Sequence, residues 1–241
     1  MMARALRRLK VREVPGLPDR ERFFARPGPA VGVGAALVAV VAIMAVFVPA
    51  EPLAIDRRWA EAMQDIQTPL LHDLARVFDF LGRGLGVVLS VVAVGVVLFL
   101  GRRWSALFAF AIVEALAPLS SSLLKAATRR ARPPDGIVHP HGTSFPSGHT
   151  TYAAATSVAL VLLFSAPGPR RRWWWALAGL GVVGMGWSRT YLQVHWLSDV
   201  VAGALLGIGI ALLVFGATQR TSQGRPSDPD WGTRGSPPDR A

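Results

Sequence analysis

The chain contains no cysteine, and charged residues are scarce. The lack of cysteine excludes disulfides, thiolate metal sites and catalysis by a thiol. Charged residues make up 17% of the 241 positions, and the 15 Asp and Glu residues form no cluster of the kind that holds a metal ion. Hydrophobic residues reach 51%. The chain is therefore too apolar for an ordinary soluble domain, and we expect one membrane-embedded domain.

The hydrophobic residues are concentrated in six blocks, each near the length of a membrane-spanning helix. A helix of about 20 residues crosses the hydrocarbon layer of about 30 Å. The expected spans are 30–48, 84–100, 104–124, 149–166, 173–187 and 200–217. In residues 53–81, apolar side chains recur at helical spacing among charged ones, which predicts one or two amphipathic helices at the interface, broken near Pro69. The predicted fold is all-α: a six-span helical bundle with an interfacial amphipathic helix.

Polar segments flank the predicted membrane domain, which we place at residues 27–217. Residues 1–26 are rich in Arg without a sustained apolar run, and residues 218–241 are rich in Pro, Gly, Ser and Arg. Both compositions predict disordered tails. Because six spans return the chain to its starting side, both tails are expected on the same face of the membrane.

The net charge of +11 raises the possibility of nucleic-acid binding, but the basic residues flank the apolar blocks. With six spans, 17 Lys and Arg residues fall on the face that carries the tails and 9 on the other. Cytoplasmic loops of membrane proteins carry the excess of positive charge. We therefore predict cytoplasmic termini, a multi-pass protein of the cell membrane, and no nucleic-acid partner.

Three polar segments meet at the other predicted face, which is periplasmic or extracellular. They are Lys125 to Arg132, the loop that ends in Pro146-Ser147-Gly148-His149, and Ser188 to Asp199. Phosphoryl transfer depends mainly on positioning and on stabilising negative charge. Arg132 and Arg189 offer forked donors, and Lys125 offers a compact charge. Arg132 precedes a proline, which disfavours helix there and predicts an extended loop.

The fourth predicted span begins at an anion-binding sequence. Ser144 is a candidate N-cap, Pro146 suits a first turn, and Gly148 permits close approach of the backbone to a ligand. Free amides at a helix start attract anions, Ser147 adds a hydroxyl, and His149 is placed to protonate a leaving oxygen.

His195 and Asp199 are four residues apart, which indicates a nucleophile and the group that orients it. They face the same way if they share a helical turn, or meet through the loop if Ser198 caps the sixth span. In either arrangement the carboxylate binds one ring nitrogen and leaves the other free to attack phosphorus.

These segments resemble the three motifs of the type 2 phosphatidic acid phosphatase superfamily. The matching residues are Lys125-x6-Arg132-Pro133, Pro146-Ser147-Gly148-His149 and Ser188-Arg189-x5-His195-x3-Asp199. That superfamily includes lipid phosphate phosphatases, undecaprenyl diphosphate phosphatases, glucose-6-phosphatase and vanadium haloperoxidases. The six-span pattern is similar to its membrane branch over about residues 30–217.

The resemblance implies a lipid phosphatase that needs no metal and no cofactor. His195 is then the nucleophile, Asp199 its partner and His149 the general acid. The implied phosphate-binding residues are Lys125, Arg132, Ser147, Gly148 and Arg189. The implied substrate is a lipid phosphate or diphosphate, and the role we favour is recycling of a carrier lipid, undecaprenyl (or decaprenyl) diphosphate. The alternative substrates are phosphatidic acid and phosphatidylglycerol phosphate. The motifs leave the lipid tail, the oligomeric state and two rival activities open: a non-hydrolytic phospholipid binder or transporter, and a lipid phosphotransferase.

Several polar residues outside the motifs have simpler interpretations. Arg129 and Arg130 are expected to be solvated or to face lipid headgroups. The two histidines of 139–141 are too few donors for a metal site and indicate a loop. Glu114 lies within the third span, where burial is costly, and either lines a polar cavity or pairs within the bundle. Glycines at 203 and 207 predict close helix packing, within the bundle rather than between copies.

Overall fold

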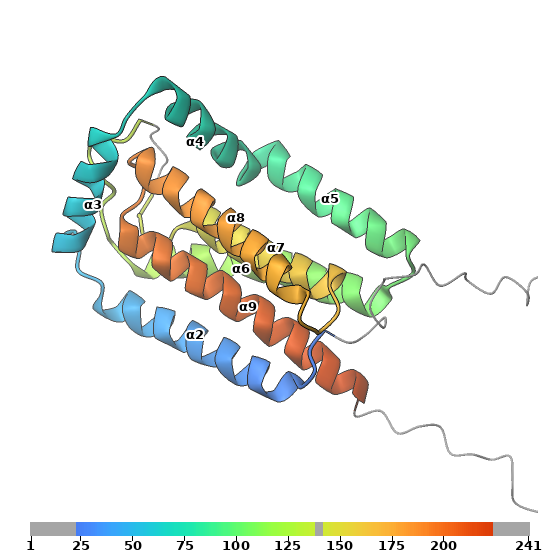
Figure 1. Cartoon of the computed structure of the whole chain (residues 1–241). Coiled ribbons are helices and arrows are strands. Elements are labelled where there is room, and N and C mark those ends of the chain that lie inside the picture. The colour runs from blue at the N-terminus through green and yellow to red at the C-terminus, as the bar shows by residue number, and fades with distance from the viewer. Residues whose placement is uncertain (1–22, 138–141, 224–241) are drawn as a thin grey trace, which may run out of the picture.

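The computed structural model describes residues 23–137 and 142–223, and in them it is entirely helical (Figure 1). These residues form eight helices and no strand, which confirms the all-α prediction. The helices are α2 (Pro27–Phe47), α3 (Ala54–Asp65), α4 (Pro69–Leu81), α5 (Gly84–Leu100), α6 (Trp104–Ala127), α7 (Gly148–Phe164), α8 (Arg171–Tyr191) and α9 (Leu197–Gln223). Most of the predicted tail residues, and both histidines of the 139–141 loop, lie outside the described residues.

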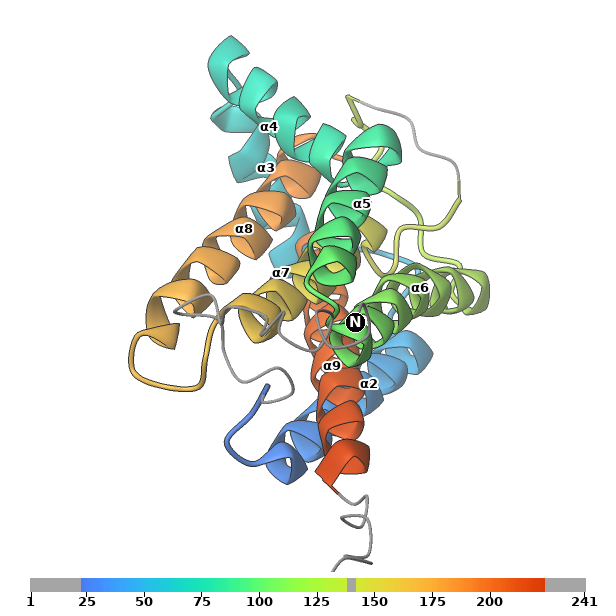
Figure 2. The same ribbon diagram turned by 90° about the vertical axis from the view of Figure 1, so that its right-hand side faces the viewer.

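Helix α7 occupies the centre of the bundle and packs on α6, α8 and α9 (Figure 2). The contact with α9 is close because glycines of α9 face α7. A Cβ atom at Gly207 would lie 2.2 Å from the Thr151 carbonyl oxygen, and one at Gly203 would lie 2.5 Å from the Ser147 carbonyl oxygen. The glycine spacing in α9 therefore serves packing inside the bundle, as predicted.

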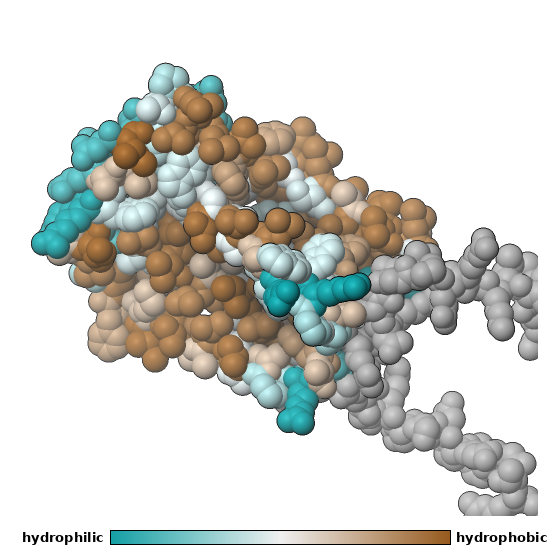
Figure 3. All heavy atoms as spheres, in the orientation of Figure 1, coloured by the Kyte–Doolittle hydropathy of each residue, from teal (hydrophilic) through white to brown (hydrophobic). Residues whose placement is uncertain are grey.

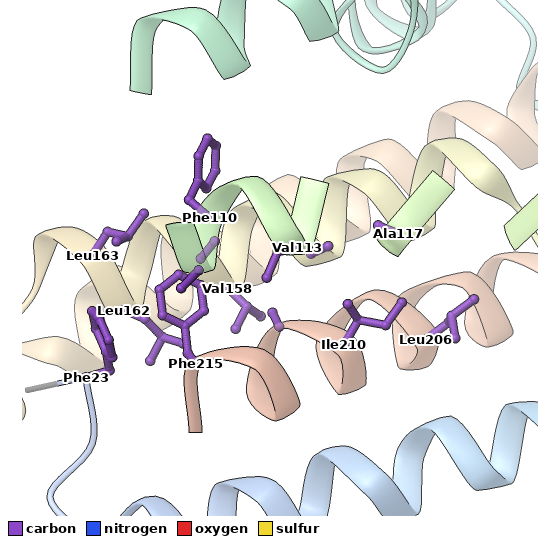
Figure 4. Close-up of a cluster of buried hydrophobic side chains, with 14 of the residues drawn as sticks. Phe23, Phe110, Val113, Ala117, Val158, Leu162, Leu163, Leu206, Ile210 and Phe215 are labelled. Atoms are coloured by element: carbon purple, nitrogen blue, oxygen red, sulfur yellow. The ribbon is translucent and has the colours of Figure 1, made fainter. Parts of the chain in front are cut away.

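The main hydrophobic core lies between α6, α7 and α9 and extends to the chain that precedes α2 (Figure 4). Phe23 is buried there, with its ring edge-to-face against Phe215 at a centroid distance of 4.9 Å. The side-chain oxygen of Gln219 accepts hydrogen bonds from the backbone of Phe23 and Phe24 at 3.0 and 2.8 Å. These contacts explain why α9 continues past Ala217, where the last span was expected to end. They also place both ends of the described chain at one end of the bundle.

The basic loops that we assigned to the cytoplasmic face lie at that same end. Arg103, in the turn between α5 and α6, donates to the Leu163 carbonyl at 2.8 Å. Arg171, at the start of α8, donates to the Phe23 carbonyl at 2.6 Å and to Ser165 Oγ at 3.0 Å. Arg103 thus links the start of α6 to the end of α7, and Arg171 links the start of α8 to the end of α7 and to the segment before α2.

The surface of the bundle is strongly hydrophobic along its length, with hydrophilic residues at its two ends (Figure 3). Many large apolar side chains are exposed, among them Phe47 at 79%, and an aqueous surface would not tolerate them in such numbers. By length and composition, α2, α6 and α9 are candidate spans, and the α4–α5 pair, bent by 55°, is a fourth. Helix α7 is apolar but shorter. The six-span count stays a prediction.

The amphipathic stretch forms two helices, α3 and α4, at the end of the bundle opposite the start of α2 and the end of α9 (Figure 1). The break falls at residues 66–68, next to the predicted Pro69, and Thr68 Oγ1 caps α4 by accepting from the Leu71 amide at 3.3 Å. Asp56 caps α3 by accepting from the Leu53 amide at 3.1 Å. Both helices pack on α8. They cover the end of the bundle where the three motifs lie.

Candidate active site

The three motif segments converge at the end of the bundle where α3 and α4 lie. The loop of 128–147 leaves α6 and leads into α7, and residues 192–196 join α8 to α9. The amide of Ser147 donates to the Asp199 carbonyl at 3.0 Å, which ties the start of α7 to the start of α9. Residues that lie far apart in the sequence therefore share one site.

The start of α7 differs from the prediction at its cap. The helix begins at Gly148 after Ser147, so Ser144 is not the N-cap and Pro146 precedes the first turn. Ser144 is instead buried, and its amide donates to the Arg130 carbonyl at 2.9 Å. This bond ties Ser144 to an earlier residue of the same loop, so Ser144 does not reach the start of α7.

His195 and Asp199 meet through the loop and not on a shared helical turn. His195 lies before α9, whereas Asp199 lies in the first turn of α9. The Nδ1 atom of His195 is 3.6 Å from Oδ2 of Asp199, and the same oxygen accepts from the Trp196 amide at 2.9 Å. On the other side of the ring, Nε2 lies 3.2 Å from Nη1 of Arg132. One ring nitrogen thus faces the carboxylate of Asp199 and the other faces the guanidinium of Arg132.

The imidazole of His195 is held in its neutral form. Burial lowers its pKa to about 3; the positive charges of Lys125 and Arg132 lower it further and the carboxylate of Asp199 opposes them. With the proton on Nδ1, which faces Asp199 at 3.6 Å, the lone pair of Nε2 points toward Arg132. A neutral imidazole is the form that can attack an electrophile without prior deprotonation.

Arg132 and Lys125 hold the loop that encloses His195. Arg132 lies on extended chain, as predicted, and donates to the carbonyls of Gly142, Thr143 and Val194 at 3.0, 3.2 and 2.7 Å. Lys125, in the last turn of α6, donates to the carbonyl of Thr143 at 3.1 Å. Both cations thus donate to the same carbonyl of this loop, that of Thr143.

His149 and Arg189 form a second group around the carboxylate of Asp79, which belongs to none of the three motifs. Arg189 donates to Oδ1 of Asp79, and Nε2 of His149 is 3.5 Å from the same oxygen. Asp79 is near the end of α4, where Gly82 permits close approach, since a Cβ atom there would lie 2.6 Å from the His149 ring. The amphipathic helices therefore supply a site residue that sequence reasoning missed.

The two groups interact electrostatically. Burial lowers the pKa of Arg132, Asp199 opposes that shift, and the positive charge of Arg189 lowers it further. His149, His195 and Arg189 therefore lie on the same side of the bundle and around one concentration of positive charge. Such a site attracts a phosphate group.

The prediction for Arg130 is wrong, whereas Arg129 is exposed as expected. The guanidinium of Arg130 is fully buried and donates to Asp199 Oδ1 at 2.6 Å, to Asp56 Oδ2 at 2.6 Å and to Ser198 Oγ at 2.7 Å. Asp56 also accepts from the Ser198 amide at 2.9 Å. Burial is possible here because two carboxylates compensate one cation. The group fixes the carboxylate of Asp199, which faces His195.

Glu114 lies in α6, and the two histidines of the 139–141 loop lie outside the described residues. Glu114 lines a cavity and also accepts a hydrogen bond from Thr156 Oγ1 at 2.8 Å, so both predicted environments apply. Within the described parts of the chain, no group of three or more His, Asp or Glu side chains is placed to hold a metal ion.

Comparison with known proteins identifies the class of molecule. The sequence profile of the PAP2 superfamily matches residues 102–223, which contain all three motifs. Phosphatidylglycerophosphatase B of Bacillus subtilis is 30% identical over 176 residues, covering 70% of this chain and 86% of that protein. An undecaprenyl-diphosphatase of Sulfolobus acidocaldarius is 38% identical over 82 residues, which cover 33% of this chain and 37% of that protein.

Solved structures show the same fold. The crystal structure of a transmembrane PAP2-type phosphatidylglycerolphosphate phosphatase from Bacillus subtilis matches with a TM-score of 0.68 and 28% identity, covering 80% of this chain and 98% of that one. The structure of LpxE from Aquifex aeolicus matches with a TM-score of 0.51 at 22% identity, a likeness of fold alone.

The helical membrane fold and the phosphate-directed site define a membrane-bound phosphatase. The chain belongs to the PAP2 superfamily, and within it the chain is a lipid phosphatase.

Proposed function

We propose that the chain hydrolyses a lipid phosphate or diphosphate through a phosphohistidine on His195, without a metal, at the outer face of the cell membrane. The observation that carries the proposal is the orientation of the His195 ring. Its Nδ1 faces Asp199 while its Nε2 lies beside Arg132. A histidine that served only to bind phosphate would gain nothing from a neutral ring held by a buried carboxylate.

In the first step, Nε2 of His195 attacks phosphorus and the bond from phosphorus to the lipid oxygen breaks. His149 donates a proton to that oxygen, so the lipid leaves as an alcohol, or as a lipid monophosphate from a diphosphate. Asp199 stabilises the positive charge that develops on the ring. The cations Lys125, Arg132 and Arg189 bind the equatorial oxygens, where the transition state carries its charge.

In the second step, His149 accepts a proton from a water molecule that attacks the phosphohistidine. The bond from Nε2 to phosphorus breaks, and inorganic phosphate and the free imidazole are regenerated. Ser147 and the free amides at the start of α7, close to Gly148, complete the binding of the phosphoryl group. Asp79 lies close enough to His149 to orient it through both steps.

The proposed site faces the periplasm or the exterior of the cell, and α2, α5, α6, α7, α8 and α9 cross the bilayer. Support comes from Arg103 and Arg171, which lie at the opposite end of the bundle, close to Phe23 and the start of the described chain. Because the chain has no cysteine, single cysteines report topology directly. The variant Asp135→Cys should react with an impermeant maleimide on intact cells, and Pro167→Cys only after lysis. The reverse pattern would invert the orientation.

The reaction itself is tested by phosphate release in detergent with a chelator present. Wild-type protein should release inorganic phosphate from a lipid phosphate or diphosphate, and His195→Gln should release none. Acid-labile phosphate trapped on wild-type protein and missing from His195→Gln identifies the intermediate. Dependence on an added divalent cation, or turnover by His195→Gln near the wild-type rate, would refute the mechanism.

A further inference from the structure

A cavity of about 570 Å³ opens beside the phosphate-binding residues and runs between α5, α6 and α7. Lys125, Gly148 and His149 line one part of it, and Glu114 and Tyr152 line another. The catalytic proposal uses the first part only. The second part extends along α6 from Lys125 to Glu114.

The wall formed by α6 and α7 carries buried polar atoms that lack partners. Oε1 of Glu114 is bonded to Thr156, but Oε2 is buried and makes no hydrogen bond with any described residue. Ser121 Oγ is in the same situation within the described chain. The Tyr152 hydroxyl, which lies beside Thr156 and Ser90, also lacks a hydrogen bond of good geometry among the residues described. Unpaired buried polar groups are costly, so these atoms indicate a polar ligand.

The polar groups extend along a long stretch of α6 and lie on one side of the cavity. Glu114 precedes Lys125 by eleven residues on α6, which corresponds to about 16 Å along the helix axis, or about three turns. Ser121 and Ser122 line the intervening stretch. The α5 side of the cavity is apolar and consists of valines. The cavity thus presents hydrogen-bonding groups to one side of its occupant and hydrocarbon to the other.

We propose that this wall is a subsite for the polar linker of a glycerophospholipid phosphate, with Glu114 as its specificity-determining residue. The inference rests on the proposed function and names the substrate class. In such a lipid, hydroxyl, phosphodiester and ester carbonyl groups follow the terminal phosphate, and they supply donors and acceptors along the wall. The serine and tyrosine hydroxyls donate to carbonyl and phosphodiester oxygens, and Glu114 accepts from a glycerol hydroxyl.

A polyprenyl diphosphate does not match the wall. Its hydrocarbon begins directly after the second phosphate, so Ser121, Tyr152 and Glu114 face a chain with no donor or acceptor. A site built to hydrogen-bond a substrate rejects an analogue that leaves its buried groups unpaired. The polar wall therefore favours the glycerolipid over the polyprenyl substrate, although both carry the same reacting group.

The test compares phosphatidylglycerol phosphate with farnesyl diphosphate in detergent, with kcat/KM measured for each by phosphate release. Glu114→Leu should lower kcat/KM for the glycerolipid about tenfold or more, the scale of one buried hydrogen bond, and leave it equal or higher for farnesyl diphosphate. Glu114→Gln, which keeps hydrogen-bonding capacity, should retain most of the wild-type ratio. The exposed Glu51 gives a matched control, since Glu51→Leu should change neither value.

The possible outcomes separate the two proposals. If wild-type protein releases phosphate but Glu114→Leu lowers both values by the same factor, Glu114 has only a structural role and the subsite is refuted. Should Glu114→Leu fold poorly, Tyr152→Phe removes one donor at nearly constant shape, and an unchanged substrate ratio would equally refute it. If wild-type protein releases phosphate from neither lipid, the proposed function itself fails.

Discussion

Replacement of Arg130 by methionine tests whether the buried ion group positions the catalytic carboxylate. In the structure, Arg130 contacts Asp199 and Asp56 at 2.6 Å each, and its side chain is fully buried. Methionine keeps most of the length and apolar character but leaves two buried carboxylates without their cation. Removal of one partner from a buried ion pair costs about 3–5 kcal/mol. We therefore expect Arg130→Met to lower the free energy of unfolding by about that amount.

The same substitution is expected to affect turnover more than binding. Arg130 is a positioning residue, since it reaches His195 only through Asp199. A displacement of a catalytic group by about 1 Å costs about 100-fold in rate. We expect kcat to fall by about that factor while KM changes little, and ¹⁵N NMR of labelled histidine should show that His195 no longer holds one tautomer.

The adjacent Arg129 provides the control, because it has the same chemistry but is exposed. Arg129→Met should match wild type in thermal unfolding and in kcat. A double-mutant cycle with Asp56→Asn separates the two carboxylate contacts, because residues in one ionic network do not act additively. If Arg130→Met unfolds like Arg129→Met and keeps kcat within twofold of wild type, the reasoning about the ion group is wrong.

Three further predictions follow from the site and the packing. Asp79→Asn removes the charged partner of Arg189 and should lower kcat about 10-fold or more. Asp73 is exposed on the same helix, so Asp73→Asn should leave kcat unchanged. Equal activities of the two variants would contradict a role for Asp79. Because the pKa of His195 is lowered to about 3, its ring should stay neutral from pH 8 to 5 in ¹⁵N NMR spectra. The free energy of unfolding should fall below about pH 6.5, because there the unfolded chain binds a proton that the folded site does not. Titration of His195 near 6.5 would refute this prediction. Gly207→Ala should lower the free energy of unfolding by about 1–3 kcal/mol, because its Cβ meets the Thr151 carbonyl. Gly179→Ala, where no atom lies within 4 Å, should not lower it. Similar stabilities of the two variants would contradict the packing argument.

The sequence alone was sufficient to predict the features that depend on neighbouring residues in the chain. Hydrophobic blocks and helical periodicity predicted the helices because burial in lipid or protein depends on contiguous composition. The break near Pro69 and the extended chain at Arg132 followed from the restrictions that proline imposes. The order and spacing of the motifs indicated phosphate chemistry, since cations, histidines and a carboxylate in that arrangement have few other uses.

Long-range pairings decided what the sequence left open. Arg129 and Arg130 are equivalent in composition, yet one is exposed and the other is buried against carboxylates 69 and 74 positions away. Asp79 belongs to the site only because the bend after α4 brings it to α7 and α8. No local pattern distinguishes it from Asp73 on the same amphipathic helix.

The amino-acid sequence thus determined the helical class, the approximate limits of the helices and the chemical groups of the site. The tertiary structure decided which carboxylates orient those groups and where a polar cavity runs beside them. The physical reason is that helix formation and membrane burial are set by neighbours along the chain, whereas the partners of a buried charge are set by the packing of distant helices.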